Sequence, residues 1–177
     1  MDRRTLLGGS GVLLAAQALS LKAEARAVAT PVLAEDQHFM QLAIDQAKLG
    51  DFPFGAVIVR DGKVVAEGFN SGKRLHDPTA HGEMMAIRHF LEKHSPQEFK
   101  DATLYTSGEP CVMCMGAIIW CRFRRMVFAA SISELATRIG QIDITSEQIA
   151  NATPFSAIEI TGGVLSAEAM QLFPEKK

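Results

Sequence analysis

Apolar and polar residues follow two different periods along the chain, and these periods predict its helices and strands. Apolar residues at positions 39, 40, 43, 44 and 47 follow the spacing of an amphipathic helix over residues 36–49, which Gly50 ends. Residues 54–60 and 63–69 are strand-like runs joined by Asp61-Gly62, a strong signal for a two-residue turn. The pattern therefore predicts a helix followed by a β-hairpin.

The remaining periodic segments complete one domain. They predict helices over 81–94, 111–121, 133–139 and 166–173, and strands over 102–107, 125–130 and 157–161. The first of these helices must end before Pro96. In the segment 131–154, the apolar residues outside 133–139 follow no clear helical or strand period. With no internal repeat or linker, this order predicts a single α/β domain in which helices cover both faces of one mixed sheet.

The N-terminal stretch has the layout of an export signal. Arg3-Arg4 precedes an apolar run over residues 6–21, and Ala25-Arg26-Ala27 follows it. Paired arginines at this place are typical of bacterial twin-arginine export, with cleavage after Ala27 and delivery to the periplasm. A membrane anchor is the alternative, but the run is shorter than the roughly 20 residues that a spanning helix needs. We expect a leader at 1–27, a folded domain at 28–177 and no stable membrane association after cleavage.

Charge favours a small substrate over a nucleic acid. The chain has 177 residues, of which 47% are hydrophobic and 21% charged, as in ordinary globular domains. Without the predicted leader, 14 basic and 18 acidic residues remain, a formal charge of −4. Nucleic-acid binding depends largely on neutralising phosphates. The one basic cluster is Arg122, Arg124 and Arg125, which we interpret as a solvated turn between a helix and a strand.

Two short motifs offer a metal site: His81-Gly82-Glu83 and Pro110-Cys111-Val112-Met113-Cys114. His81, Cys111 and Cys114 are three zinc ligands, and three protein ligands leave the open position that catalytic zinc requires. Each motif lies at the start of a predicted helix, so two helix N-termini can converge on one ion. The i, i+3 spacing places both sulfur atoms on one side of their helix.

Glu83 is left over for proton transfer. It follows His81 by two residues, about 200° around an ideal helix, so both side chains are not expected to bind the same ion. Zinc can bring water to hydroxide near neutral pH, and a neighbouring carboxylate can carry the protons. We therefore predict that Glu83 takes a proton from the attacking water and passes protons to a ring nitrogen and to leaving ammonia.

Two other interpretations of these residues stay open. A C-x-x-C after a strand is also typical of thioredoxin-like redox sites, and an exported protein meets oxidising conditions. A structural zinc would need a fourth ligand, for which Cys121 and three histidines, His76, His89 and His94, are the candidates. H-x-E followed by P-C-x-x-C, in that order, instead favours the hydrolytic site of zinc deaminases.

The same motifs carry a family resemblance. Residues 53–59 (PFGAVIV), 67–70 (EGFN), 77–83 (DPTAHGE) and 104–114 (LYTSGEPCVMC) resemble the cytidine and deoxycytidylate deaminase superfamily, in particular guanine deaminases and bacterial tRNA adenosine deaminases. The resemblance implies a three-layer α/β/α sandwich around a mixed five-stranded sheet. It also implies one Zn²⁺ per chain held by His81, Cys111 and Cys114, Glu83 as proton shuttle, and a homodimer or larger homo-oligomer.

The resemblance further suggests substrate contacts. By position, Asn70 would hydrogen-bond the base or sugar, and the backbone around Ala80 and Glu109 would line the pocket; Asn70 as a plain turn residue is the alternative. Phe54 and Trp120 match aromatic pocket positions of guanine deaminases and could sandwich a purine, with core packing as the alternative for both. The C-terminus lacks the arginine-rich terminal helix of the tRNA enzymes and also the long tail of the guanine deaminases.

These observations together predict a function. It is zinc-dependent hydrolytic deamination of a free nucleobase or nucleoside, with guanine, which would yield xanthine and ammonia, as the first candidate. A tRNA adenosine deaminase and a thiol redox protein are the alternatives.

Overall fold

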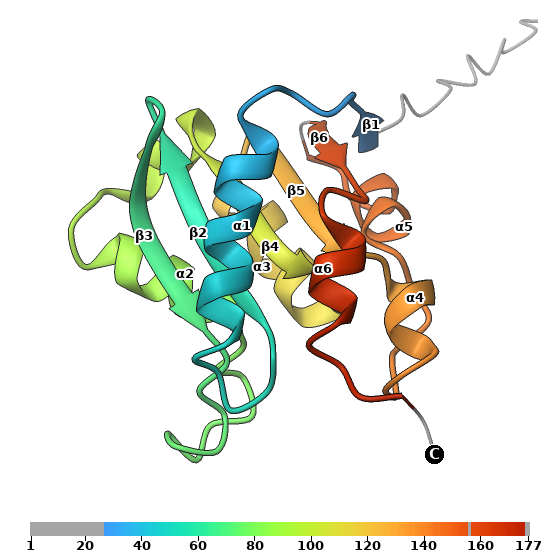
Figure 1. Ribbon diagram of the computed structural model, residues 1–177. Coiled ribbons are helices and arrows are strands. Elements are labelled where there is room, and N and C mark those ends of the chain that lie inside the picture. Colours follow the sequence, from blue (N-terminus) through green and yellow to red (C-terminus); the bar gives the residue numbers. More distant parts are fainter. Residues whose placement is uncertain (1–26, 156, 176–177) are drawn as a thin grey trace, which may run out of the picture.

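The computed structural model describes residues 27–155 and 157–175, and they form one mixed sheet between two layers of helices (Figure 1). The strands are β1 (Ala27–Ala29), β2 (Gly55–Arg60), β3 (Lys63–Phe69), β4 (Thr103–Gly108), β5 (Arg125–Ala130) and β6 (Ile158–Thr161), in the order β1-β6-β5-β4-β2-β3. β4, β5, β6 and β1 are parallel, whereas β2 is antiparallel to both β4 and β3. The predicted α/β sandwich is confirmed.

The predicted count of five strands is wrong, because β1 adds a sixth. β1 has three residues, too few for a period to be seen, and it pairs with β6, a partner far away in the sequence. The predicted leader lies outside the described residues, except that its last residue, Ala27, begins β1.

Six α-helices and one 3₁₀ helix are described: α1 (Asp36–Ala47), α2 (Gly82–Leu91), η1 (Pro96–Asp101), α3 (Val112–Cys121), α4 (Ile132–Ala136), α5 (Ser146–Asn151) and α6 (Ser166–Met170). α1 and α6 cover the face of the sheet that is turned to the viewer in Figure 1, and α2 and α3 cover the other. The pattern did not predict η1 or α5, although each begins with a capping box, at Ser95 and Thr145. None of the described helices is long and apolar enough to cross a membrane.

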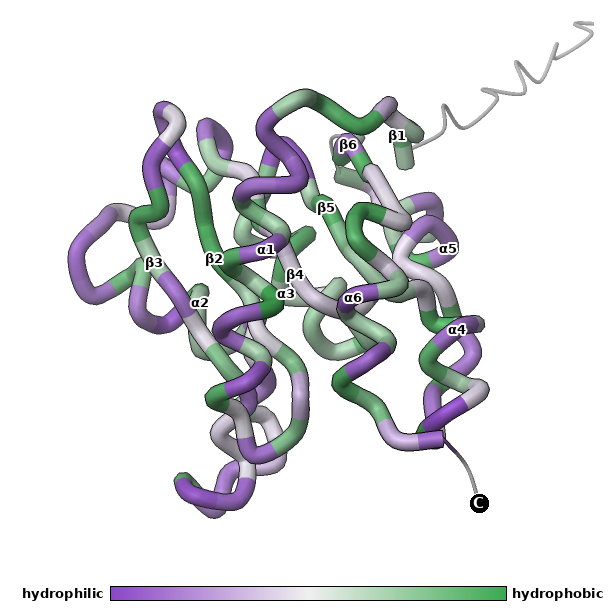
Figure 2. The backbone as a smooth tube through the Cα atoms, viewed as in Figure 1, coloured by the Kyte–Doolittle hydropathy of each residue, from purple (hydrophilic) through white to green (hydrophobic). Residues whose placement is uncertain are grey.

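The sheet has a hydrophobic core on each face. Along β2, Ala56 and Ile58 join the core beneath α2 and α3, whereas Val57 and Val59 join the core beneath α1. A central strand that is buried on both faces must be apolar throughout, and Figure 2 shows hydrophobic residues along the inner strands. The two cores hold the inner strands in place, so the loops at their ends have a rigid base.

A buried ion pair ties α1 to the sheet. Both oxygen atoms of Asp36 accept hydrogen bonds from Arg125, at 2.7 and 2.8 Å, and Tyr105 donates to Asp36 at 2.9 Å. Burial raises the pKa of Asp36, but the hydrogen bonds from Arg125, the Leu33 amide and Tyr105 outweigh it and lower the pKa overall. The interpretation of Arg125 as part of a solvated turn is wrong: its side chain is needed inside to neutralise Asp36.

α2 packs closely against the hairpin because Gly68 has no side chain. A Cβ atom at Gly68 would lie 2.2 Å from the amide nitrogen of Ala86 and 2.4 Å from the carbonyl oxygen of Gly82. Both atoms belong to the backbone of α2, the helix that follows His81, and cannot move aside separately. Gly68 therefore sets the distance between the hairpin and the start of α2.

We expect Gly68→Ala to lower the free energy of unfolding by about 1–3 kcal/mol, because the methyl group must push α2 off β3. Urea unfolding checks this. Gly140→Ala is the matched control, since a Cβ there meets nothing within 4 Å. Equal stability of the two variants would contradict the prediction.

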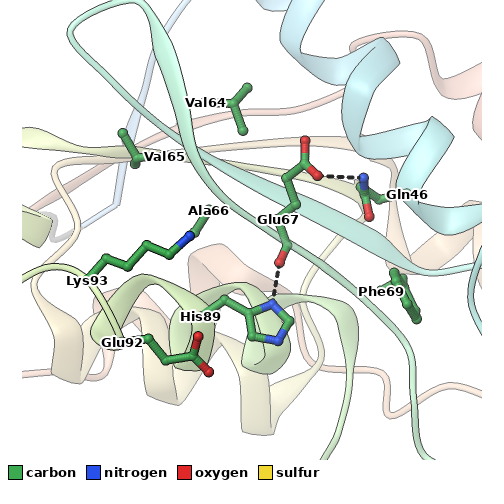
Figure 3. A pocket seen from close by; sticks show the side chains of 9 residues that line it. All are labelled: Gln46, Val64, Val65, Ala66, Glu67, Phe69, His89, Glu92 and Lys93. Carbon is green, nitrogen blue, oxygen red and sulfur yellow. Dashed lines mark hydrogen bonds between the residues drawn. The ribbon is translucent and has the colours of Figure 1, made fainter.

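The β3 edge of the sheet is covered in part by side chains. β1 and β3 are the two edge strands, and at β3 His89 of α2 donates from Nδ1 to the carbonyl of Glu67 at 2.7 Å, while Gln46 of α1 donates to the Glu67 carboxylate at 3.0 Å (Figure 3). Such contacts hinder pairing with another strand. The hollow beside them, about 450 Å³, contains none of the predicted metal ligands.

Candidate active site

The predicted metal ligands sit at the starts of two helices. His81 is the N-cap residue of α2 and Cys111 is the N-cap residue of α3, both with extended backbone. Neither side chain caps its helix. Each main-chain carbonyl accepts the first helical hydrogen bond, at 2.9 Å for His81 and 2.8 Å for Cys111, so both side chains are free to bind an ion.

The distances between the ligand atoms suit one tetrahedral zinc ion. Nδ1 of His81 lies 3.7 Å from Sγ of Cys111 and 3.6 Å from Sγ of Cys114, and all three atoms lie within 4.8 Å of one another. Bond lengths of about 2.3 Å to sulfur and 2.05 Å to nitrogen give an N···S separation of about 3.6 Å at a tetrahedral centre. The three residues that the motifs predict are therefore brought together with the spacing that zinc needs.

Hydrogen bonding moves the pKa values of the two ligand thiols in opposite directions. The hydrogen bond from Cys114 lowers the pKa of Cys111 to about 4, with His81 as a further cause, and the same hydrogen bond raises the pKa of Cys114. One thiolate is thus formed at neutral pH without any metal. Zinc binding displaces the second proton as well, because thiolate is the form that binds it.

Glu83 is buried directly beside the ligands. Only 4% of the residue is exposed, and burial raises the pKa of its carboxyl group. Cys114, Cys111 and His81 all interact with the Glu83 carboxyl group, so Glu83 and the ligands share one small space. A carboxyl group held this close to the ion can accept a proton and return it, which is what a proton shuttle requires.

Asn70 and Ala80 lie on one loop, which joins β3 to α2 and leads into His81. The side-chain oxygen of Asn70 accepts from the Gly72 amide at 3.2 Å, as in a turn, and the Asn70 amide donates to the Phe54 carbonyl at 2.8 Å. Ala80 is fully buried, and its carbonyl accepts from the Ser71 amide at 2.8 Å. This hydrogen bond joins the two ends of the loop and so fixes the backbone that leads into His81.

Phe54 touches the site through its backbone and the core through its ring. Its carbonyl lies against Gly82, whereas its ring lies 5.2 Å from the ring of Phe173 and against Gly108. Sequence reasoning missed Ser107, whose hydroxyl accepts from the Gly55 amide at 3.0 Å and joins the start of β2 to the end of β4. Ser107 lies in the 104–114 motif that carries the family resemblance, but its contact with Gly55, 52 residues earlier, cannot be read from that motif.

The structure does not bring Trp120 to the metal ligands of its own chain. It lies six residues beyond Cys114, about 9 Å along the axis of α3. It is 72% exposed, and its ring contacts Phe155. That the backbone around Glu109 lines the substrate pocket stays a prediction; the carboxylate of Glu109 is bound by the first residues of α4 and α5.

Comparison with known proteins identifies the family. A family model for the cytidine and deoxycytidylate deaminase zinc-binding region matches residues 33–130. The chain belongs to the cytidine and deoxycytidylate deaminase family. In this family it is 38% identical to the guanine deaminase of Bacillus subtilis over 132 residues, which cover 71% of this chain and 83% of that protein.

Two further members of the deaminase family are also similar to this chain in sequence. The tRNA-specific adenosine deaminase of Buchnera aphidicola is 37% identical over 141 residues, which cover 77% of this chain and 85% of that protein. The solved structure of a guanine deaminase from Nitrosomonas europaea is 28% identical with a TM-score of 0.65, covering 80% of this chain and 84% of that one.

Family and geometry together assign the chemistry. The protein is a zinc-dependent deaminase, and His81, Cys111 and Cys114 are placed to hold the ion. When bound, zinc lowers the pKa of a water molecule so that hydroxide is available near neutral pH. A dithiol redox site has no use for a histidine at this distance from both sulfur atoms, so the geometry favours metal binding.

Proposed function

We propose that the protein deaminates a free amino-purine, guanine first, and releases xanthine and ammonia. The observation that carries the proposal is the burial of Glu83 against three ligands with zinc spacing. The NH₂ group of Asn70 is a donor, which suits a base with a carbonyl oxygen, as guanine has and adenine lacks. The names of similar proteins, guanine deaminases among them, point the same way.

Glu83 performs the proton transfers in this proposal. It accepts a proton from the attacking water, and the resulting hydroxide adds to the ring carbon that carries the amino group. Glu83 passes this proton to the adjacent ring nitrogen. It then takes the proton of the added hydroxyl group and gives it to the amine, which leaves as ammonia while the carbonyl of the product forms. The buried position of Glu83 keeps bulk water from competing for these protons.

A tRNA adenosine deaminase is the second candidate, because relatives of that name match this chain equally well. The charge of the described surface speaks against it. Of the three clustered arginines, Arg125 is buried with Asp36, and Arg124 lies 3.6 Å from Glu159. The cluster thus presents two exposed arginines, Arg122 and Arg124, rather than three to the phosphates of a tRNA.

An ammonia-release assay on the zinc-loaded protein separates the candidates. The substrates are guanine, guanosine, adenosine, cytosine and cytidine, together with a tRNA anticodon stem-loop that carries adenosine. We expect release from guanine at the highest kcat/KM. Release from the stem-loop alone would establish the second candidate, and release from none of them would overturn the proposal.

We also propose that the enzyme is a homodimer that packs through α3. The outward face of α3 carries Val112, Met113, Gly116, Ala117 and Trp120, which include no charged residue, and a Cβ at Gly116 would meet nothing within 4 Å. Gly116 lies midway between Val112 and Trp120. An antiparallel α3 pair that crosses at Gly116 would set Trp120 of the second copy beside Val112, next to the metal ligand Cys111. Trp120 could then reach a substrate across the interface.

Sedimentation analysis tests the dimer. We expect twice the mass of the chain for the unmodified protein and the mass of one chain for Gly116→Glu, because a buried carboxylate opposes association. Gly140→Glu, at an open position of a loop, is the control and should remain dimeric. A monomeric unmodified protein would contradict the proposal.

We propose, finally, that residues 1–27 direct twin-arginine export to the periplasm. Arg3-Arg4, the apolar run and Ala25-Arg26-Ala27 support this. The mass of the protein from the periplasm of an expressing bacterium should correspond to residues 28–177. Arg3→Lys/Arg4→Lys should leave the uncleaved chain in the cytoplasm. Export that is unaffected by this double substitution would refute the twin-arginine route.

A further inference from the structure

Glu109 is a buried carboxylate that the proposed reaction does not use. One of its oxygen atoms accepts from the amide and the hydroxyl of Ser146, at 2.8 and 2.7 Å, and the other accepts from the amide of Ile132 at 2.9 Å. The residue is 8% exposed, and its own amide donates to Ala130 at 2.7 Å. All of its polar atoms thus face the protein interior, although it lies only two residues before Cys111.

The two amides that bind Glu109 belong to the first residues of two helices. Ile132 begins α4 and Ser146 begins α5. The side chains of Ser131 and Thr145 already satisfy the third amide of each helix in capping boxes. Ile132 and Ser146 are both buried, so Glu109 supplies the acceptor that their amides cannot find in solvent. By doing so it also links both helix starts to the loop that carries the metal ligands.

α4 in turn supports a residue of the candidate pocket. At Gly108, a Cβ atom would lie 2.9 Å from the ring of Phe54 and 3.1 Å from the side chain of Leu135, a residue of α4. Leu135 and Phe54 therefore meet over Gly108, the residue before Glu109. A shift of α4 would be passed to the Phe54 ring, and from there to the backbone of Phe54 against Gly82.

We infer that Glu109 is a positioning residue: its carboxylate holds residues 132–146 against the metal-binding loop and so fixes the substrate pocket. In the segment between the two helices, 137–145, Ile139 packs against the core beneath α1, whereas Ile142 and Ile144 are 58% and 42% exposed. The exposed part of the segment depends on the two helix starts that Glu109 holds together. The inference about the pocket rests on the proposed deaminase function, whereas the inference about residues 132–146 does not.

Glu109→Gln is the discriminating variant. Glutamine keeps the shape and one acceptor oxygen, but its NH₂ group must face an amide or a hydroxyl that needs an acceptor. Glu134→Gln is the matched control. Glu134 also binds the start of α4, through the amide and hydroxyl of Ser131, and accepts from the hydroxyl of Ser166 in α6, yet it is exposed and these hydrogen bonds do not reach the metal loop. Ser146→Ala is a milder variant that removes a single hydroxyl from the same carboxylate.

Two measurements are made on the full zinc-loaded chain. Amide hydrogen exchange without substrate should show at least tenfold lower protection at residues 132–146 in Glu109→Gln, and no change at these residues in Glu134→Gln. With the best substrate of the unmodified enzyme, KM should rise at least tenfold in Glu109→Gln while kcat stays within about threefold. Ser146→Ala should raise KM two- to fivefold, which keeps the test valid if Glu109→Gln fails to fold.

The outcomes test separately whether Glu109 holds residues 132–146 in place and whether this affects the substrate pocket. Unchanged exchange at 132–146, or an equal loss of protection in Glu134→Gln, overturns the role of Glu109. Lost protection with an unchanged KM overturns its effect on the pocket. If the unmodified protein releases no ammonia from any substrate, the proposed function fails, while the exchange measurement still decides whether Glu109 positions the segment.

Discussion

Glu83→Gln is expected to lower kcat by about 10²–10⁴-fold while zinc stays bound at one ion per chain. Glutamine has nearly the shape of glutamate but cannot accept a proton from water and return it. Since Glu83 is buried and is not among the three residues that fit the ion, its replacement should leave the ligands in place. Steady-state ammonia release and metal analysis of the same sample measure both effects.

Glu92→Gln is the control for this prediction, because it removes the same charge from an exposed position directly after α2. Its kcat should equal that of the unmodified enzyme. If Glu83→Gln kept full activity with zinc bound, another group would have to carry the protons. If it lost the ion, Glu83 would be a ligand or would support one.

Arg125→Met is expected to lower the free energy of unfolding at pH 7 by about 3–5 kcal/mol, because it leaves the buried Asp36 without its counter-charge. Methionine is similar in length to arginine, so the lost stability reflects the missing charge more than a change in side-chain volume. Urea unfolding monitored by circular dichroism gives the value. Arg124→Met removes an exposed arginine next to it and should change stability by less than about 0.5 kcal/mol.

The pH dependence of stability should reverse in Arg125→Met. In the unmodified protein the pKa of Asp36 is lowered, so its stabilisation is complete above the unfolded pKa of about 3.9 and is lost as the pH falls through the lower folded value. Without Arg125, burial raises the pKa of Asp36, and the variant should therefore gain stability as the pH falls from 7 to 5. Parallel pH profiles of both proteins would contradict this account.

The sequence predicted the metal site well because its evidence is local. His81 and the two cysteines each lie at the start of a helix that follows a loop, and helix starts are marked by short motifs. Glu83 could be separated from the ligands by helix geometry alone. The inner strands were also predictable, since a central strand such as β2 is apolar along its whole length.

The remaining features depend on distant partners and leave no local trace. The pattern of Arg122, Arg124 and Arg125 is that of an exposed turn, and only the position of Asp36, 89 residues before Arg125, makes the last of them a core residue. The carboxylate of Glu109 likewise owes its place to Ser146, 37 residues later. Short elements such as β1 and α5 were missed because they have too few residues to show a period.

The pairing of β1 with β6 has a consequence for synthesis. Thr30, just after β1, and Thr161, the last residue of β6, share a hydrogen bond of 2.8 Å across 131 positions of the chain. A chain that leaves the ribosome N-terminus first cannot close this edge of the sheet until almost all of it has emerged. Residues 27–30 are thus among the earliest to be made and among the last that can find their native partners, and the segment beside the predicted leader waits unpaired until then.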